Sequence, residues 1–154
     1  MAISAPPLAF QGELIERHRA VRSVRTELPL RGDEDVVGLR KQVRERAIAL
    51  ALSLVDQTKL VTAASELARN TLKYGGGGVA YLDTLDDGSR RGIALTFVDA
   101  GPGIVDIDTA LRDGYTTGGG LGLGLGGSRR LVDEFAIDSR VGEGTVVVAV
   151  KWIR

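Results

Sequence analysis

The 154-residue sequence contains no cysteine and a single histidine, His18. Without cysteine, the chain can form neither a disulfide framework nor a cysteine-ligated metal site. One histidine argues against a histidine-based metal centre and against a Ser-His-Asp hydrolase. These absences remove several common enzyme classes before any motif is considered.

The chain also has no excess of one charge, and it has few aromatic residues. Lys and Arg together number 20, as do Asp and Glu, so the formal net charge is zero, and aromatic residues make up 5% of the chain. A chain with no basic field and few side chains for stacking is not expected to bind nucleic acid.

Long apolar runs are absent as well. No run approaches the roughly 18 residues that a membrane-spanning helix needs. The N-terminus, MAISAPPLAFQGELIERHRA, lacks a charged region followed by a long apolar core, so it does not resemble a secretion signal. We therefore expect a cytoplasmic protein with no membrane partner.

Apolar periodicity predicts two helices after a strand at about residues 21–28. Asp33 is expected to cap the first helix and Asp56 the second, which the GGGG at 75–78 ends. The expected apolar stripes are Val36, Leu39, Val43, Ala47, Leu50 and Leu54 on the first helix, and Leu60, Ala64, Leu67 and Thr71 on the second. Steps of three or four residues are typical of a helix that packs one face on a core.

The second half of the chain is mostly strand-like. Residues 79–85 and 91–99 form an expected hairpin around DDGS, and residues 136–140 and 145–154 form another around VGEG. Short helices are expected at 108–112 and 127–135. This order predicts an α+β fold, a two-layer α/β sandwich whose mostly antiparallel sheet carries helices on one face.

Residues 21–154 are expected to form one domain, preceded by an extension at 1–20. Pro6 and Pro7 discourage regular structure at the start, whereas Glu13 to Arg25 is rich in charge. The extension is either a disordered terminus or a segment that binds a partner.

Two motifs combine acidic and amide side chains. Glu66 and Asn70 in SELARN lie one helical turn apart, which suits a general base beside an oxygen ligand for Mg²⁺, or simply an exposed polar face. Asp99 ends a strand before Gly101 and Gly103, where a carboxylate can accept a hydrogen bond from a ligand's amino group. A plain turn is the alternative for the second motif.

Residues 118–127 read GGGLGLGLGG, with leucines that can anchor the stretch to the core. No strand precedes it, which argues against a dinucleotide-binding loop, and Ser128 stands where a Walker A loop requires lysine. Bare N–H groups at a helix start still attract phosphate, although a glycine-rich packing turn is the alternative. Thr145, in GEGT, can offer a hydroxyl to a nucleotide.

Together the four motifs resemble the GHKL nucleotide-binding family, which has the Bergerat fold, over about residues 21–154. The resemblance implies ATP and Mg²⁺ as cofactors, Glu66 as catalytic base and Asn70 as the Mg²⁺ ligand. It also implies an ATP-binding set comprising Asn70, Asp99, Gly101, Gly103, Gly120, Leu121, Gly122, Leu123, Gly124, Leu125, Gly126 and Thr145.

Within this family the chain resembles the RsbT-type serine/threonine kinases of bacterial partner-switching and stressosome systems. That resemblance implies RsbS/RsbR-like STAS-domain proteins as substrates, and a PP2C-type phosphatase or another output protein as a second partner. Arg40 and Arg44 resemble positions that face the STAS partner, and Arg129 and Arg130 can hold phosphate or an acidic partner group. A charged helix face explains each arginine pair equally well.

Two other functions stay open from the sequence. One is an ATP-binding anti-sigma factor or sequestering module in which catalysis is not essential. The other is a histidine-kinase fragment that would carry phosphate on His18, although no helical hairpin typical of that class surrounds this residue.

Overall fold

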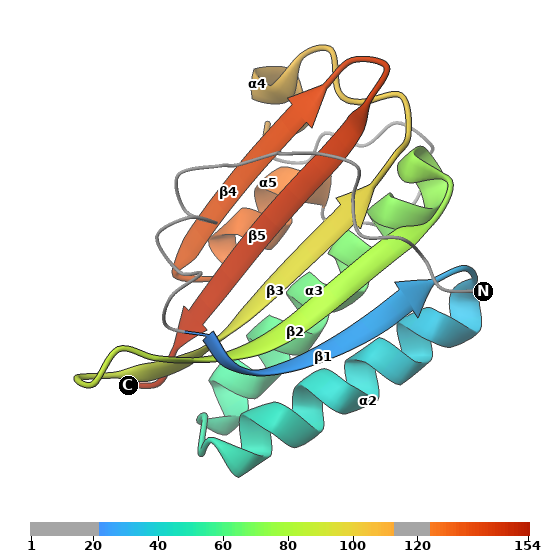
Figure 1. The fold of residues 1–154 in the computed structure, drawn as a ribbon. Helices are drawn as coiled ribbons and strands as arrows, with labels where there is room; N and C mark the ends of the chain where they lie inside the picture. The colour runs from blue at the N-terminus through green and yellow to red at the C-terminus, as the bar shows by residue number, and fades with distance from the viewer. Residues whose placement is uncertain (1–21, 113–123) are drawn as a thin grey trace.

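An antiparallel five-stranded sheet, in the order β1-β2-β3-β5-β4, forms one layer of the molecule (Figure 1). The structure is a computed structural model and describes residues 22–112 and 124–154. The strands are β1 (Arg22–Leu30), β2 (Gly78–Asp86), β3 (Arg91–Asp99), β4 (Glu134–Arg140) and β5 (Gly144–Trp152). Every neighbouring pair is antiparallel, as the two predicted hairpins require.

The helices form the second layer, behind the sheet in Figure 1. They are α2 (Asp33–Ala49), α3 (Leu54–Gly75), α4 (Ile107–Ala110) and α5 (Gly124–Arg130). The predicted α+β sandwich, with helices on one face of an antiparallel sheet, is therefore confirmed.

The main core lies between the long helices and the sheet. Leu39 and Val43 of α2 and Leu60 and Leu67 of α3 are inaccessible to solvent or nearly so, and they share one cluster with Phe97 of β3. Burial of each such side chain contributes about 1.5–3 kcal/mol. This packing fixes α3 against the sheet, which matters because α3 carries two of the predicted site residues.

The connection between α2 and α3 differs from the prediction. Ser53 is the N-cap of α3, and its hydroxyl accepts a hydrogen bond from the backbone N–H of Asp56, 3.1 Å away. Asp56 therefore lies in the first turn, and Leu54 is 72% exposed and takes no part in the stripe of α2. The expected cap at Asp33 is also wrong, because Gly32 is the N-cap of α2.

The prediction of a helix over residues 127–135 is wrong for the second half of that range. Helix α5 ends at Arg130, and β4 begins at Glu134. Tertiary contacts explain the difference: the Asp133 carboxylate accepts the backbone N–H of Trp152 at 2.7 Å, and the Asp133 N–H donates to the Val150 carbonyl at 2.8 Å. These bonds hold the segment beside β5 and override its weak helical pattern.

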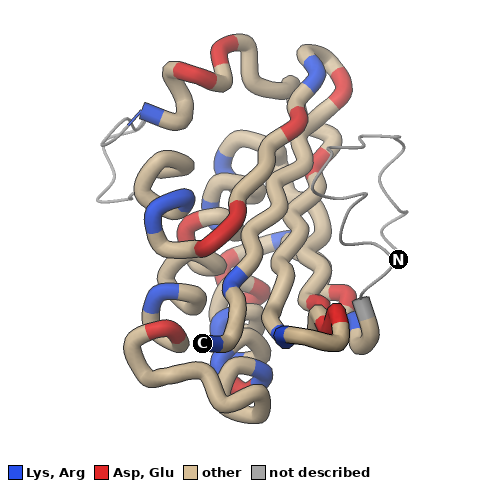
Figure 2. Tube along the Cα trace, turned by 90° about the vertical axis from the view of Figure 1, so that its left-hand side faces the viewer, with Lys and Arg blue, Asp and Glu red and all other residues tan. Residues whose placement is uncertain are grey.

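Charges of both signs are mixed along the long helices (Figure 2). Helix α2, for example, has acidic residues in its first turn and Arg46 in its last. None of the helices in residues 22–112 and 124–154 combines the length and apolar character needed to cross a bilayer.

Candidate functional site

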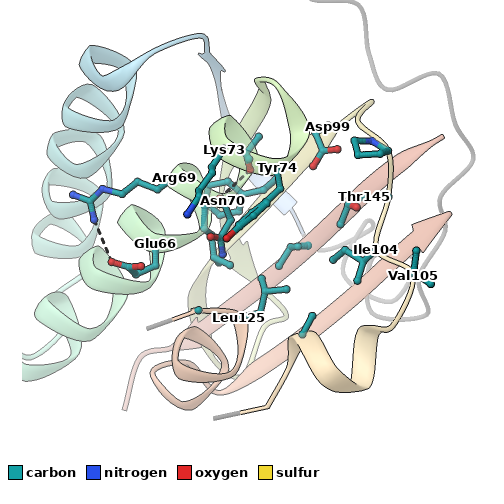
Figure 3. Close-up of a pocket in the computed structure, with 18 of the residues that line it drawn as sticks. Glu66, Arg69, Asn70, Lys73, Tyr74, Asp99, Ile104, Val105, Leu125 and Thr145 are labelled. Atoms are coloured by element: carbon teal, nitrogen blue, oxygen red, sulfur yellow. Dashed lines mark hydrogen bonds and ion pairs between the residues drawn. The ribbon is translucent and has the colours of Figure 1, made fainter. Parts of the chain in front are cut away.

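A cavity of about 730 Å³ lies between α3, the ends of β3 and β5, and the segment from Pro102 to Ala110 (Figure 3). Its lining includes Glu66, Arg69, Asn70, Lys73, Tyr74, Phe97, Asp99, Gly103, Ile104, Val105, Thr109, Gly124, Leu125, Thr145 and Val147. Seven residues from the four predicted motifs meet here, namely Glu66, Asn70, Asp99, Gly103, Gly124, Leu125 and Thr145.

One wall of the cavity is a polar face of α3. Glu66, Asn70 and Lys73 follow one another at steps of four and three residues, so their side chains lie on the same side of the helix. The Arg69 guanidinium donates to the Glu66 carboxylate at 3.1 Å, and the Glu66 side chain is 14% exposed. This contact orients a partly buried carboxylate at the cavity edge.

Asp99 lies at the far end of the cavity, where β3 stops. Its carboxylate accepts the backbone N–H of Gly101 at 2.9 Å. Burial raises the pKa of Asp99, and hydrogen bonds from the backbone of Gly101 and Thr145 offset part of that effect. A half-buried carboxylate is the kind of acceptor that a ligand amino group can satisfy.

Gly75, the last residue of α3, makes this position of Asp99 possible. A Cβ atom at Gly75 would lie 2.5 Å from the Cβ of Asp99 and 2.7 Å from its Oδ2. A Cβ at Gly101 would in turn lie 2.7 Å from the Cα of Gly75. Glycine at both positions lets the strand end and the helix end approach each other closely.

A hydroxyl pair ties the loop after Asp99 to the second hairpin. The Ser139 and Thr145 hydroxyl oxygens are 2.7 Å apart, and the backbone N–H of Ile104 donates to Ser139 Oγ at 2.7 Å. Gly103 has φ +80°, and a Cβ there would collide with the carbonyl oxygen of Arg140. Thr145 is thereby held at the cavity wall with a fixed partner.

The glycine-rich stretch is described from residue 124 onward. Gly124 and Leu125 line the cavity, and Leu125 also packs on the main core, as expected of an anchoring leucine. Gly126 is buried, and a Cβ there would collide with the Leu111 carbonyl oxygen. The predicted residues Gly120, Leu121, Gly122 and Leu123 lie outside the described residues.

The predicted arginines lie elsewhere. Arg40 and Arg44 are on α2, away from the cavity lining, and Arg44 donates to the Gln57 side chain at 3.5 Å. Arg129 and Arg130 occupy the last turn of α5 and are exposed.

Several lining residues were not predicted. Lys73 continues the helical spacing of Glu66 and Asn70 by three residues, so extension of that spacing would have found it. Its ammonium lies 5.2 Å from the centre of the Tyr74 ring. Ser139 had no sequence pattern of its own and becomes relevant only through the pairing of β4 with β5.

The dimensions and chemistry of the cavity fit a nucleoside triphosphate with Mg²⁺. Glu66 and Gly75, which touches Asp99, are nine residues apart, so about 13 Å of helix axis separates the two ends. The aliphatic side chains of Ile104 and Val147 suit a flat base near Asp99, and Asn70 and Lys73 suit phosphates. Among the described residues, no group of three His, Cys, Asp or Glu side chains could hold a metal ion.

Comparisons with known sequences agree with this geometry. Residues 55–153 match the family described as histidine kinase-, DNA gyrase B-, and HSP90-like ATPase. The serine/threonine-protein kinase RsbT of Bacillus subtilis (strain 168) is 44% identical over 120 residues, which cover 78% of this chain and 90% of that protein. The anti-sigma F factor of Anoxybacillus flavithermus is 31% identical over 108 residues, which cover 66% and 73%.

A solved structure shows the same fold. The RsbU and RsbW domains of Rv1364c from Mycobacterium tuberculosis match with a TM-score of 0.60 at 18% identity. The match covers 86% of this chain and 33% of that longer chain. The family and the RsbT likeness predicted from the sequence are thus confirmed: this chain belongs to the histidine kinase-, DNA gyrase B- and HSP90-like ATPase family, whose domains use ATP, and it is a relative of the serine/threonine-protein kinase RsbT.

Proposed function

We propose that this chain is an ATP- and Mg²⁺-dependent serine/threonine protein kinase that phosphorylates an RsbS/RsbR-like STAS-domain regulator. After transfer it would bind an output partner such as a PP2C-type phosphatase. The observation that carries the proposal is the common cavity of Glu66, Asn70 and Asp99, with the base candidate at one end and the amine acceptor at the other. The relation to RsbT, a protein named as a serine/threonine kinase, supports it.

Different segments of the chain would hold different parts of the nucleotide. Asp99, with Gly101, Gly103 and Thr145 around it, would hold the adenine, since its buried carboxylate can accept from an exocyclic amine. The bare main chain from Gly120 to Gly126 would bind the phosphates. Lys73, which lines the same wall, adds a positive charge that opposes phosphate repulsion.

Glu66 would act as the general base. It accepts the proton of the partner's seryl or threonyl hydroxyl as the hydroxyl oxygen forms its bond to the γ-phosphorus, the bond to the β–γ bridging oxygen breaks, and ADP leaves. Asn70 would hold Mg²⁺, which when bound neutralises charge on the phosphates. Arg69 orients the base through its 3.1 Å contact.

The partner would approach the open side near Glu66. Arg40 and Arg44 on α2 are proposed contacts for the STAS domain, because it must present a hydroxyl next to this helix layer. Arg129 and Arg130, exposed at the end of α5, are proposed to contact phosphate or an acidic partner group.

Transfer of label from γ-labelled ATP to a purified STAS-domain partner tests this function. We expect acid-stable phosphoserine or phosphothreonine with the wild-type chain. Glu66→Gln should reduce the rate about 100-fold or more while ATP still binds, because the base is lost and the cavity is kept. Glu45→Gln, at an exposed position on α2, is the matched control and should transfer normally.

The main alternative is a sequestering module, which the relation to an anti-sigma F factor supports. Such a module would bind ATP and its partner without transfer, and Glu66→Gln would then change nothing. Acid-labile phosphate on His18 would instead indicate a histidine-kinase fragment. Either result contradicts the serine/threonine kinase proposal.

A further inference from the structure

The ion pair between Glu66 and Arg69 holds the proposed base at one edge of the cavity. Arg69 Nη1 lies 3.1 Å from Glu66 Oε1. The two charged groups point toward each other, on the side of α3 away from Asp99 and Thr145 (Figure 3). A charge-assisted contact therefore keeps the carboxylate beside α3 and away from the middle of the cavity.

The position of this carboxylate matters because a general base must lie within hydrogen-bond reach of the proton that it accepts. Phosphates held by Asn70 and Lys73 would place the reacting hydroxyl over the side of α3 that carries these two residues. Glu66 precedes Asn70 by four residues, so its carboxylate can reach that side by rotation about its own side-chain bonds. In the free chain this rotation breaks the contact with Arg69.

The two members of the ion pair differ in exposure. The Arg69 side chain is 55% exposed, whereas the Glu66 side chain is 14% exposed, so a docking protein meets the guanidinium before the carboxylate. A guanidinium has five N–H donors in a planar fork, which fits a carboxylate through two parallel hydrogen bonds. An acidic side chain on the docking protein is thus the group that can draw Arg69 away from Glu66.

We propose that Arg69 is a positioning residue that restrains Glu66 until an acceptor protein brings an acidic side chain close to its hydroxyl. The inference rests on the proposed kinase function. The acceptor carboxylate pairs with Arg69, Glu66 turns towards the acceptor hydroxyl, and Glu66 then accepts the proton during transfer. The site thereby selects acceptors whose serine or threonine has Asp or Glu close by. In the absence of an acceptor, the same restraint limits loss of ATP to water.

Release of inorganic phosphate from ATP by the chain alone tests the restraint without any partner. In this side reaction a water oxygen bonds to the γ-phosphorus, Glu66 accepts the proton, the bond to the β–γ bridging oxygen breaks, and ADP leaves. Arg69→Met keeps the aliphatic stem but removes the N–H donors. It should raise the release rate about 3- to 10-fold, the order expected for loss of one partly exposed charged contact. Arg69→Lys keeps a cation and should stay closer to the wild type.

Two further variants show whether the effect belongs to this ion pair. Arg69→Met/Glu66→Gln should lose the increase, because the released base is no longer present. Arg31→Met removes a guanidinium that pairs with Asp35 at 3.3 Å outside the cavity lining, and it should leave the release rate unchanged. A purely structural role of Arg69 would not make the increase depend on the Glu66 carboxylate.

Transfer to a purified STAS-domain acceptor tests the selection of an acidic group. The acceptor is compared with a form in which the acidic side chains nearest its phosphorylated residue are changed to amides. The wild-type chain should phosphorylate the neutral form about 10-fold more slowly, because a hydrogen-bonded charge pair is lost. Arg69→Met should phosphorylate both forms at the same rate.

Four results would overturn the proposal. They are unchanged phosphate release in Arg69→Met, an increase that persists when Glu66 is also replaced, a wild-type chain that does not distinguish the two acceptors, and a loss of ATP affinity in Arg69→Met. The last result would make Arg69 a nucleotide contact. A wild-type chain that transfers no phosphate contradicts the kinase function instead, and phosphate release still decides the role of Arg69.

Discussion

Asp99 is the residue at which a substitution should most clearly affect ATP binding without lowering the free energy of unfolding. Its Oδ1 accepts the Gly101 N–H, and a carboxylate has further lone pairs that can accept from a ligand amine. In Asp99→Asn, an amide NH₂, which cannot accept, replaces the second oxygen. We expect ATP affinity to fall about 10- to 100-fold, because a hydrogen bond to a charged group contributes about 1.5–3 kcal/mol.

The same substitution should not reduce the free energy of unfolding. Burial raises the pKa of Asp99, so the folded state disfavours its charged form. This destabilising contribution is absent at low pH and develops as pH rises through the raised pKa, so the neutral asparagine avoids it at pH 7. Urea unfolding and ATP titration of Asp99→Asn, with exposed Asp108→Asn as control, check both effects. A large loss of stability without loss of affinity would contradict this role.

At the scale of single residues, the sequence predicted which side chains line the cavity better than it predicted which residues contact them. The spacing of Glu66 and Asn70 was sufficient to place both on one cavity wall, because helix geometry is fixed by residue number. The role of Ser139 could not be predicted from the sequence, since its contact with Thr145 depends on the register of β4 against β5.

Helix α3 is the element on which the proposed site depends, and its C-terminal end is its most constrained point. In Gly75→Ala the new methyl group would lie 2.5 Å from the Cβ of Asp99, so Asp99 or the helix end must move. We expect the free energy of unfolding to fall by about 1–3 kcal/mol. ATP affinity should fall as well, because the moved group is the proposed adenine acceptor.

Gly38→Ala is the matched control for this substitution. Gly38 lies inside α2, where a Cβ would have no neighbour within 4 Å. Alanine there should raise the unfolding free energy by roughly 0.5–1 kcal/mol through helix propensity and leave ATP affinity unchanged. Denaturant unfolding and ATP titration of both variants test these expectations. If Gly75→Ala behaved like the wild type in both measurements, the contact with Asp99 would tolerate a side chain at position 75, which would contradict this role of Gly75.

Element types were predictable, and element ends were less so. The four strands after α3 and both long helices follow from apolar periodicity and turn residues. Ser53 and Asp56 are both good N-cap residues, and only the three-dimensional path of the chain selects Ser53. The end of α5 could not be predicted for the same reason, since Asp133 is fixed by a hydrogen bond to the end of β5, which is distant in the sequence.

At the scale of the whole molecule, an ion network joins the C-terminal strand to both layers. The buried Lys151 ammonium lies 3.3 Å from Asp133 and 3.4 Å from Asp56, so β5, the start of β4 and the first turn of α3 meet at one cation. Arg154 also binds Asp133. Loss of one partner leaves a buried charge partly uncompensated, which is costly.

This network predicts acid sensitivity. Burial pushes the pKa of Asp133 upward, but the Trp152 N–H and the charge of Lys151 outweigh burial and lower it. Its stabilising contribution is therefore present above the ordinary aspartate pKa, about 3.9, and is lost as pH falls through the lower folded value. Asp133→Asn should lower the unfolding free energy at pH 7 by about 1–3 kcal/mol.

Urea unfolding between pH 3 and pH 7 measures this effect. The stability difference between wild type and Asp133→Asn should shrink towards the acid end, whereas Asp108→Asn, at an exposed site, should track the wild type throughout. A difference that is independent of pH would show that the carboxylate charge is not responsible.

The two-layer arrangement was predictable because element order and the two hairpins leave few ways to assemble the sheet. Residues 1–20, for which the sequence leaves a disordered terminus and a partner-binding segment both open, lie outside the described residues.

The central claim is that the cavity beside α3 binds ATP together with Mg²⁺. Isothermal titration of ATP into the full-length chain, with Mg²⁺ and then with a chelator, tests it most directly. The account predicts saturable one-site binding that weakens without Mg²⁺, and Asn70→Ala should remove the difference between the two conditions. Absence of saturable binding, or an affinity that Mg²⁺ does not change in the wild-type chain, would contradict the account.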